Sequence, residues 1–297
     1  MNKTLRRAYS LLELSMVIVI VALLITGISQ SNKLTGKIRL NSARSQSISS
    51  GILAIEDLAL WLDATNEIGI TSSTNGANFE NGDKISSWND VNKQLIAKSD
   101  AVQGTDAQRP LYSTNSLSGL PSLKFDGTDD NFSTNNVCDK NFTAFAIFRT
   151  AVSGTSGQAT LGQPILWADA STNGYDTIPM AVGGGFAKIF NGSADSTLTG
   201  SKSLINDAAH LITTSRNLVT GARTIYVDGV ADGSDSNGAA NKILNDNTSM
   251  LIGGNTINAV YFNGYIGEII VYSRALSDDE RRIVEKYLGK KWGIKII

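Results

Sequence analysis

The sequence predicts a mainly β protein: an antiparallel sandwich preceded by a long N-terminal transmembrane helix and followed by a short C-terminal helix. Three observations lead to this fold. An apolar stretch with almost no charge lies near the N-terminus, short apolar runs separated by turn signals follow from Leu58 onward, and a capped amphipathic segment lies near the C-terminus. The 297 residues are enough to bury a core without disulfides or metals.

The apolar stretch covers residues 9–28 and reads YSLLELSMVIVIVALLITGI, in which Glu13 is the only charge. Its length of about 20 residues is what a helix needs to cross a bilayer. Lys3, Arg6 and Arg7 precede it, so the positive-inside rule places the N-terminus in the cytoplasm and the rest of the chain outside.

Two simpler interpretations explain this stretch less well. A cleaved signal peptide has a shorter apolar region followed by a small-residue cleavage site, and the segment TGISQSNKL after Ile25 has no clear one. A plain signal anchor accounts for the length and the flanking charges. It does not account for Glu13, because a carboxylate inside a membrane helix is costly and usually functional.

The first 30 residues resemble the N-terminus of type IV prepilins, which has a basic leader, a small residue and then an apolar helix with Glu at its fifth position. The leader here is residues 1–8, cleavage falls between Ala8 and Tyr9, and Glu13 is the fifth mature residue. Ala8 replaces the usual Gly, and Tyr9 replaces the common Phe or Met. The resemblance implies cleavage by a prepilin peptidase and N-methylation of Tyr9. It also implies a bacterial inner-membrane location with a single pass, followed by delivery to a pilus or the cell surface.

Glu13 is the expected assembly residue. A carboxylate buried in apolar surroundings must be neutralised or paired. In a fibre of packed pilin-like subunits, the α-amino group of a neighbour supplies the partner, and the pair sets the axial register. The alternative is a carboxylate near the membrane interface that has no partner.

The segment that follows keeps a helical period. Apolar residues at helical spacing predict a helix that continues to about residue 57 and lays an apolar stripe on the globular domain or on neighbouring subunits. The stripe comprises Leu34, Ile38, Ile48, Ile52 and Ile55. The alternative is a flexible Ser/Asn tether over residues 29–50.

From Leu58 onward the period changes to two, and Asn-Gly and Asp-Gly turns separate the runs, which indicates an antiparallel sandwich. The predicted strands are 58–63, 122–126, 144–150, 164–168, 187–190, 209–215, 223–227, 249–252 and 261–272. A closing helix begins at a capping box of Ser277 and Glu280 and ends at Gly289. Its apolar face comprises Ile283, Val284, Tyr287 and Leu288.

Several segments resemble bacterial LamG-like domains of the concanavalin A-like lectin/glucanase fold. They are LALWLDA at 58–64, ISSWND at 85–90, RPLY at 109–112, LSGLPSLKFDGTDD at 117–130, IYVDG at 225–229 and FNGYIGEIIVYSRALSDDERRIVEKYLGKKWG at 262–293. The resemblance implies a jelly-roll of two curved antiparallel sheets and a binding role, often toward sugars or surface proteins. We therefore divide the chain into a leader (1–8), a transmembrane and connecting helix (9–57) and a sandwich domain (58–297).

The composition limits the chemistry. Glycoside hydrolysis needs a pair of carboxylates on one groove, but Glu268 stands alone on its strand, so we expect no enzymatic activity. One cysteine, Cys138, excludes an intrachain disulfide, and His210 is expected to be an ordinary residue before a strand. The net charge of −1 argues against a nucleic-acid partner.

A turn after a predicted strand carries Asp126, Asp129 and Asp130, and such an oxygen-rich loop could hold Ca²⁺. The alternative is that FDGTDD simply ends a strand with turn-forming residues. No other cofactor is expected. The four tryptophans, which are the residue type that most often stacks on sugars, are expected in the core, so the sequence does not locate a glycan site. They are Trp61, Trp88, Trp167 and Trp292.

These observations predict a minor type IV pilin or pseudopilin that displays an adhesin-type sandwich domain with a surface glycan or protein as ligand. The head is bulky for the repeated subunit of a thin fibre, hence the minor role. The alternatives are a type II secretion pseudopilin and a membrane-anchored lectin-like module outside any fibre. A carbohydrate-active enzyme ranks last.

Overall fold

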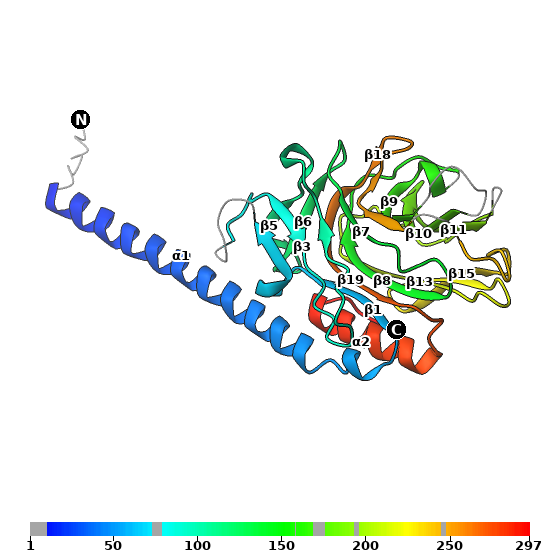
Figure 1. The fold of residues 1–297 in the computed structure, drawn as a ribbon. Coiled ribbons are helices and arrows are strands. Elements are labelled where there is room, and N and C mark those ends of the chain that lie inside the picture. Colours follow the sequence, from blue (N-terminus) through cyan, green and yellow to red (C-terminus); the bar gives the residue numbers. More distant parts are fainter. Residues whose placement is uncertain (1–10, 73–78, 158, 169–175, 193–195, 245–247) are drawn as a thin grey trace, which may run out of the picture.

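The computed structural model describes residues 11–72, 79–157, 159–168, 176–192, 196–244 and 248–297. The predicted leader and its cleavage site at Ala8 and Tyr9 lie outside these ranges. The described chain forms a globular head from which one long helix projects (Figure 1).

The projecting helix is α1, Leu11–Ile48. Among the described residues, no helix combines the length and the apolar character needed to cross a membrane. The predicted transmembrane helix and the single-pass location in the bacterial inner membrane are therefore wrong.

Helix α1 meets the head through small residues, whereas the predicted stripe meets it only beyond the helix, at Ile52 and Ile55, which are buried. Leu34, Ile38 and Ile48 are exposed, whereas Ala43 and Ser47 are buried. Small side chains let the helix axis come close to the head, and the larger residues of the period then face away. Beyond Ile48 the chain turns at Gly51, in the left-handed region at φ 73°, and passes through a short 3₁₀ helix, η1 (Ile52–Ala54).

Within the described residues the head consists of an eight-stranded sheet, a nine-stranded sheet and a two-stranded ribbon. Every described strand pair is antiparallel. The mainly β sandwich thus matches the predicted architecture.

The first sheet has the order β15-β14-β13-β8-β19-β6-β5, with β1 also paired to β19. Its strands are β1 (Leu58–Asp63), β5 (Leu111–Leu117), β6 (Leu120–Asp126), β8 (Phe142–Arg149), β13 (His210–Arg216), β14 (Arg223–Val227), β15 (Val230–Asp235) and β19 (Asn263–Tyr272). The central strand β19 is buried along almost its whole length, because one face meets the core and the other meets a helix.

The second sheet has the order β12-β11-β10-β9-β16-β7-β4-β3-β2. Its strands are β2 (Ile70–Ser72), β3 (Ile85–Trp88), β4 (Ala101–Val102), β7 (Phe132–Asn135), β9 (Gln163–Ala168), β10 (Asp176–Gly183), β11 (Phe186–Gly192), β12 (Thr197–Thr199) and β16 (Ser249–Ile252). The ribbon pairs β17 (Gly254–Asn255) with β18 (Val260–Tyr261). Three further 3₁₀ turns are η2 (Glu67–Gly69), η3 (Asp106–Gln108) and η4 (Ala159–Leu161).

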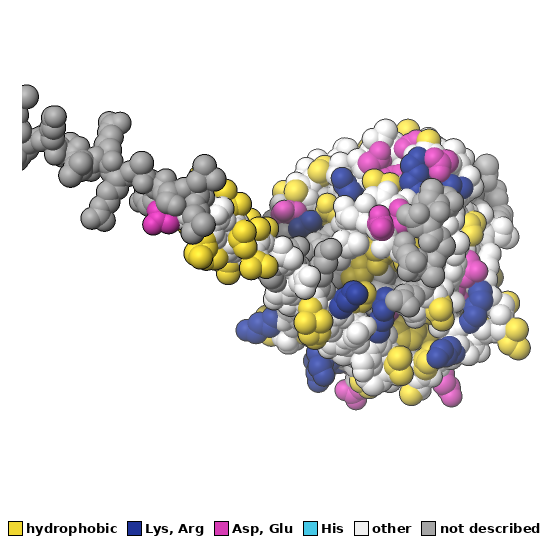
Figure 2. Space-filling view, turned by 90° about the vertical axis from the view of Figure 1, so that its left-hand side faces the viewer, with side chains coloured by type: hydrophobic (Ala, Val, Ile, Leu, Met, Phe, Trp, Pro, Cys, Tyr) yellow, Lys and Arg dark blue, Asp and Glu magenta, His cyan; other side chains and the backbone are white. Residues whose placement is uncertain are grey.

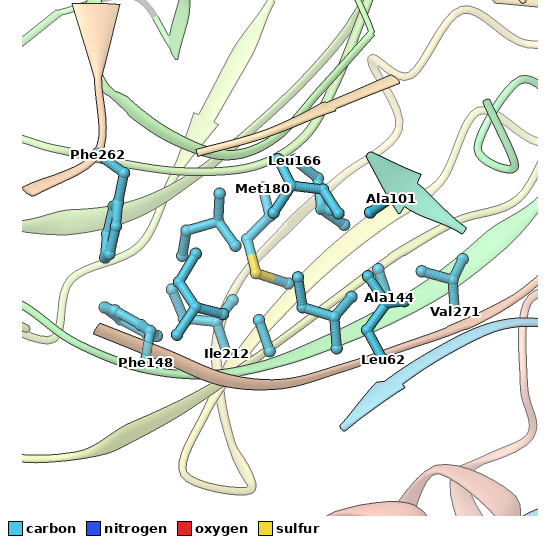
Figure 3. Close-up of a cluster of buried hydrophobic side chains, with 14 of the residues drawn as sticks. Leu62, Ala101, Ala144, Phe148, Leu166, Met180, Ile212, Phe262 and Val271 are labelled. Carbon is cyan, nitrogen blue, oxygen red and sulfur yellow. The ribbon is translucent and has the colours of Figure 1, made fainter. Parts of the chain in front are cut away.

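The main core lies between the two sheets (Figure 3). Phe148 and Ile212 point inward from the first sheet, and Leu166 and Met180 point inward from the second. The single cysteine, Cys138, is fully buried in this core. All four tryptophans are buried as predicted.

A second apolar cluster lies on the outer face of the first sheet, under α2 (Asp278–Trp292). The predicted capping box at Ser277 and Glu280 is confirmed, but the helix ends at Trp292, with Gly293 in the left-handed region, and not at Gly289. Gly289 has another role: a Cβ there would lie 2.3 Å from Ile296 Cγ1, so its missing side chain lets the C-terminal segment fold back on the helix.

Candidate functional site

The first half of α1 carries apolar side chains all round its circumference. The large apolar residues between Leu14 and Ile25 are each 46–68% exposed, and Figure 2 shows hydrophobic atoms on the helix outside the head. Glu13, on the first described turns, is also exposed. Helices that are apolar all round are normally buried, and exposed apolar patches of this kind mark interaction sites.

The C-terminal end of α1 is hydrogen-bonded to the head. Ser47 Oγ donates to Asp63 Oδ2 on β1 at 3.0 Å and accepts from Lys291 Nζ on α2 at 2.9 Å. One turn earlier, Arg44 Nε donates to the Thr65 carbonyl at 2.7 Å. The helix is thus joined to β1 and α2 at the same point.

That point is a buried charged cluster around Glu268, on the central strand β19. Both indole N–H groups of Trp61 and Trp292 donate to the Glu268 carboxylate at 2.8 Å, and Tyr287 donates to it at 2.6 Å. Lys291 Nζ lies 2.8 Å from this carboxylate and 2.8 Å from that of Asp63. Every side chain of the cluster is therefore bonded inside the protein.

One ammonium group thus serves two buried carboxylates, and the two pKa values move apart. Burial raises the pKa of Glu268. Burial acts in the same direction on Asp63, but the charge of Lys291 and hydrogen bonds from Lys291 and Thr65 outweigh it and lower the pKa of Asp63.

The predicted metal ligands do come together. Asp126 ends β6, and Asp129 and Asp130 lie in the turn toward β7; one carboxylate oxygen from each lies within 4.8 Å of the others. Burial, together with the charges of Asp126 and Asp129, raises the pKa of Asp130 to about 6. A divalent cation would relieve this repulsion, and carboxylates in a loop suit Ca²⁺, so these residues could hold one.

The same turn also shows the features of the alternative interpretation. Asp126 Oδ1 accepts from the Thr128 N–H at 2.7 Å, and Asp130 Oδ2 accepts from the Asp126 N–H at 2.9 Å. Gly127 adopts φ +79°. These bonds stabilise the turn without any ion.

His210, expected just before a strand, is the first residue of β13 and is buried. Its Nδ1 lies 2.9 Å from Asp228 Oδ2, and its Nε2 lies 2.9 Å from Asn206 Oδ1. Burial raises the pKa of Asp228, but hydrogen bonds from His210 and Lys202 outweigh it, so the net pKa is lowered. Both ring nitrogens are used inside the fold, which gives His210 a structural role.

Known proteins resemble the head. A family model described as the concanavalin A-like lectin/glucanases superfamily matches residues 126–280, which is more than half of the chain. A search of curated proteins finds no match.

Among solved structures, Trypanosoma rangeli sialidase has a TM-score of 0.50 and 19% sequence identity, over 80% of this chain and 33% of that chain. The same sialidase with sialic acid also gives 0.50, at 16% identity over 80% and 33%. Domain 4 of an extracellular arabinanase from Geobacillus stearothermophilus, in complex with arabinotriose, gives 0.49 at 14% identity, over 78% and 98%. The chain thus spans about a third of the length of the sialidases, and these likenesses concern the fold alone.

The family match corrects one expectation. The lack of a paired carboxylate motif led us to expect no enzymatic activity, but the superfamily comprises glucanases as well as lectins, so that exclusion is wrong. The matched residues run from the acidic turn at Asp126 to the capping box at Glu280 and include all nine strands from β8 to β16, together with the central strand β19. The chain therefore belongs to the concanavalin A-like lectin/glucanases superfamily.

Proposed function

We propose that this protein is a type IV pilin-like subunit, in which α1 packs against the helices of other pilin-like subunits and the sandwich is displayed as a sugar-binding head. The observation that carries the proposal is the apolar first half of α1, which leaves the head and stays exposed. Membership of the lectin/glucanase superfamily supports the binding role of the head.

Packing energetics favour assembly through this helix. Removing one large apolar side chain from water contributes about 1.5–3 kcal/mol, and the run from Leu14 to Ile25 offers many such side chains. An isolated helix is marginally stable in water, and most helical stability in proteins comes from packing. Neighbouring helices of the same kind would supply that packing.

The proposal includes processing of the N-terminus. A prepilin peptidase cleaves between Ala8 and Tyr9, and the new amine of Tyr9 is methylated. Glu13 then pairs with the α-amino group of a neighbouring subunit, which fixes the stagger between helices. The large head makes this a minor subunit, and its ligand is a glycan or a glycosylated protein on another surface.

Replacing Glu13 tests the assembly step. We expect Glu13→Ala to accumulate in cells at the normal level but to be lost from sheared fibres, because an unpaired amine is left among apolar helices. Glu56→Ala, at another exposed glutamate outside the helix, is the matched control. Equal recovery of both variants in the fibre fraction would remove Glu13 from assembly.

The mass of the N-terminal peptide tests the processing step. Protein recovered from its native cells should begin at Tyr9 and carry one added methyl group. A peptide that still contains residues 1–8 would contradict the proposed cleavage.

A further inference from the structure

A groove of about 780 Å³ lies where α1 passes the β5–β6 hairpin of the head. Its helix side includes Lys37 and Arg39, and its head side includes Phe79, Thr114 and Asn115. The volume falls in the range of about 300–1,000 Å³ that is usual for ligand sites. None of these residues lies within the family match at 126–280, so the groove does not follow from the superfamily.

The helix side of the groove is cationic. Lys37 and Arg39 are both exposed, and within the described part of the chain no ion pair joins either of them to a carboxylate. Arg39 reaches across to the hairpin turn: a Cβ on Gly119 would lie 2.5 Å from Arg39 Nη1. The absence of a side chain at Gly119 therefore leaves room for the guanidinium group.

The head side of the groove is aromatic and polar. Phe79 is half-buried and packs on Tyr112 with ring centroids 5.3 Å apart. Thr114 and Asn115 on β5 are exposed and offer a hydroxyl and an amide to the groove. Sugar rings place their apolar faces on aromatic side chains, and their hydroxyls bond to such polar groups.

We propose that this groove binds an anionic polysaccharide whose acid groups are carboxylates. Lys37 and Arg39 pair with the sugar carboxylates, Phe79 contacts a ring face, and Thr114 and Asn115 bond to hydroxyls. This inference deepens the proposed sugar-binding role of the head and rests on it. It differs from a general affinity for polyanions, because the whole chain has a net charge of −1 and the groove combines its two cations with aromatic and amide groups.

Affinity electrophoresis of the full chain in gels that contain polygalacturonate tests this assignment. We expect retardation by polygalacturonate and little by a neutral β-glucan. Lys37→Glu with Arg39→Glu should raise the Kd for polygalacturonate about tenfold or more, because two charge-assisted contacts become repulsive. The matched control is Lys98→Glu with Lys290→Glu, which makes the same change in net charge at exposed positions outside the groove.

Phe79→Ala is a second variant that leaves the charge unchanged, and it should weaken polygalacturonate binding several-fold through loss of the ring contact. Equal weakening by the groove pair and by the control pair would overturn the inference. So would equal competition by duplex DNA, or unchanged binding in Phe79→Ala. Circular dichroism of each variant checks that the sandwich is folded.

The outcomes separate this inference from the proposed function. If the groove pair of substitutions enters sheared fibres normally and the protein binds only neutral sugars, the groove assignment fails while the pilin-like role and a sugar-binding head stand. If the fibre fraction lacks even the unchanged protein but polygalacturonate binding depends on Lys37 and Arg39, the groove assignment stands and the assembly role fails.

Discussion

The two ends of α1 differ in the kind of surface that each can contact. The first half exposes large apolar side chains in every direction, whereas the last turns present Ala43 and Ser47 to the head and join a buried hydrogen-bonded cluster. Apolar contact is non-directional and suits several partners, while a buried polar cluster is satisfied in one geometry only. The helix thus has one end suited to assembly and one end fixed in its own head.

Removing the cation of Lys291, where α1 is joined to the head, should have the largest effect and is the strictest test of this difference between the two ends. Lys291→Met leaves the buried carboxylates of Asp63 and Glu268 without a cation, so we expect a loss of about 3–5 kcal/mol in the free energy of unfolding, measured by urea titration. Lys290→Met, at the exposed neighbouring position, should change it by less than about 0.5 kcal/mol. Similar losses in both variants would show that the cluster does not stabilise the head.

Two alanines of α1, one buried against the head and one exposed, allow the two ends of the helix to be compared by the same substitution. Ala43→Leu inserts three carbon atoms where α1 touches the head and should cost about 1–3 kcal/mol in the free energy of unfolding. Ala22→Leu, in the exposed half, should cost less than about 0.5 kcal/mol. If thermal unfolding gives equal shifts, the buried contact at Ala43 does not hold the helix.

The acidic turn offers the smallest of these effects and a contrast to the Lys291 cluster, because its three carboxylates face one another. The folded-state pKa of Asp130 is raised to about 6, so its cost appears as pH rises from about 4 to about 6 and persists above that range. Asp130→Asn should therefore raise the free energy of unfolding at pH 7.5 by about 1–2 kcal/mol and have no such effect at pH 4.

Calcium should remove the stability advantage of Asp130→Asn over the unchanged protein at pH 7.5. With millimolar Ca²⁺ at pH 7.5, the Tm of the unchanged protein should rise, while that of Asp130→Asn should stay constant. Glu56→Gln is the control for the loss of one exposed charge. No response of either protein to Ca²⁺ would leave the turn as a purely structural element.

Local patterns in the sequence predicted much of the sandwich. β14 and β16 were predicted with their observed bounds, and the capping box fixed the start of α2, because period-two runs and S-x-x-E are short-range signals. β10 was missed. Its segment contains Pro179 and is buried on both faces, so it has no alternation that periodicity can detect.

The sites were harder to predict than the strands. The three aspartates were found because they are neighbours in sequence. The cluster around Glu268 was missed because Ser47, Asp63 and Lys291 are far apart in the chain and each residue type is ordinary on a surface. A lysine next to Trp292, on the apolar side of α2, was the one available signal. The groove was missed for a similar reason, since it exists only where the helix passes the hairpin.

Cys138 provides a built-in reporter of whether the head is open or closed. Its thiol is fully buried between the sheets, and this burial raises its pKa, so it is both shielded and protonated in the native state. A maleimide should therefore label the protein only as fast as the sandwich opens. Because α1 lies outside that core, the labelling rate follows the head alone, even while the helices are held in a fibre.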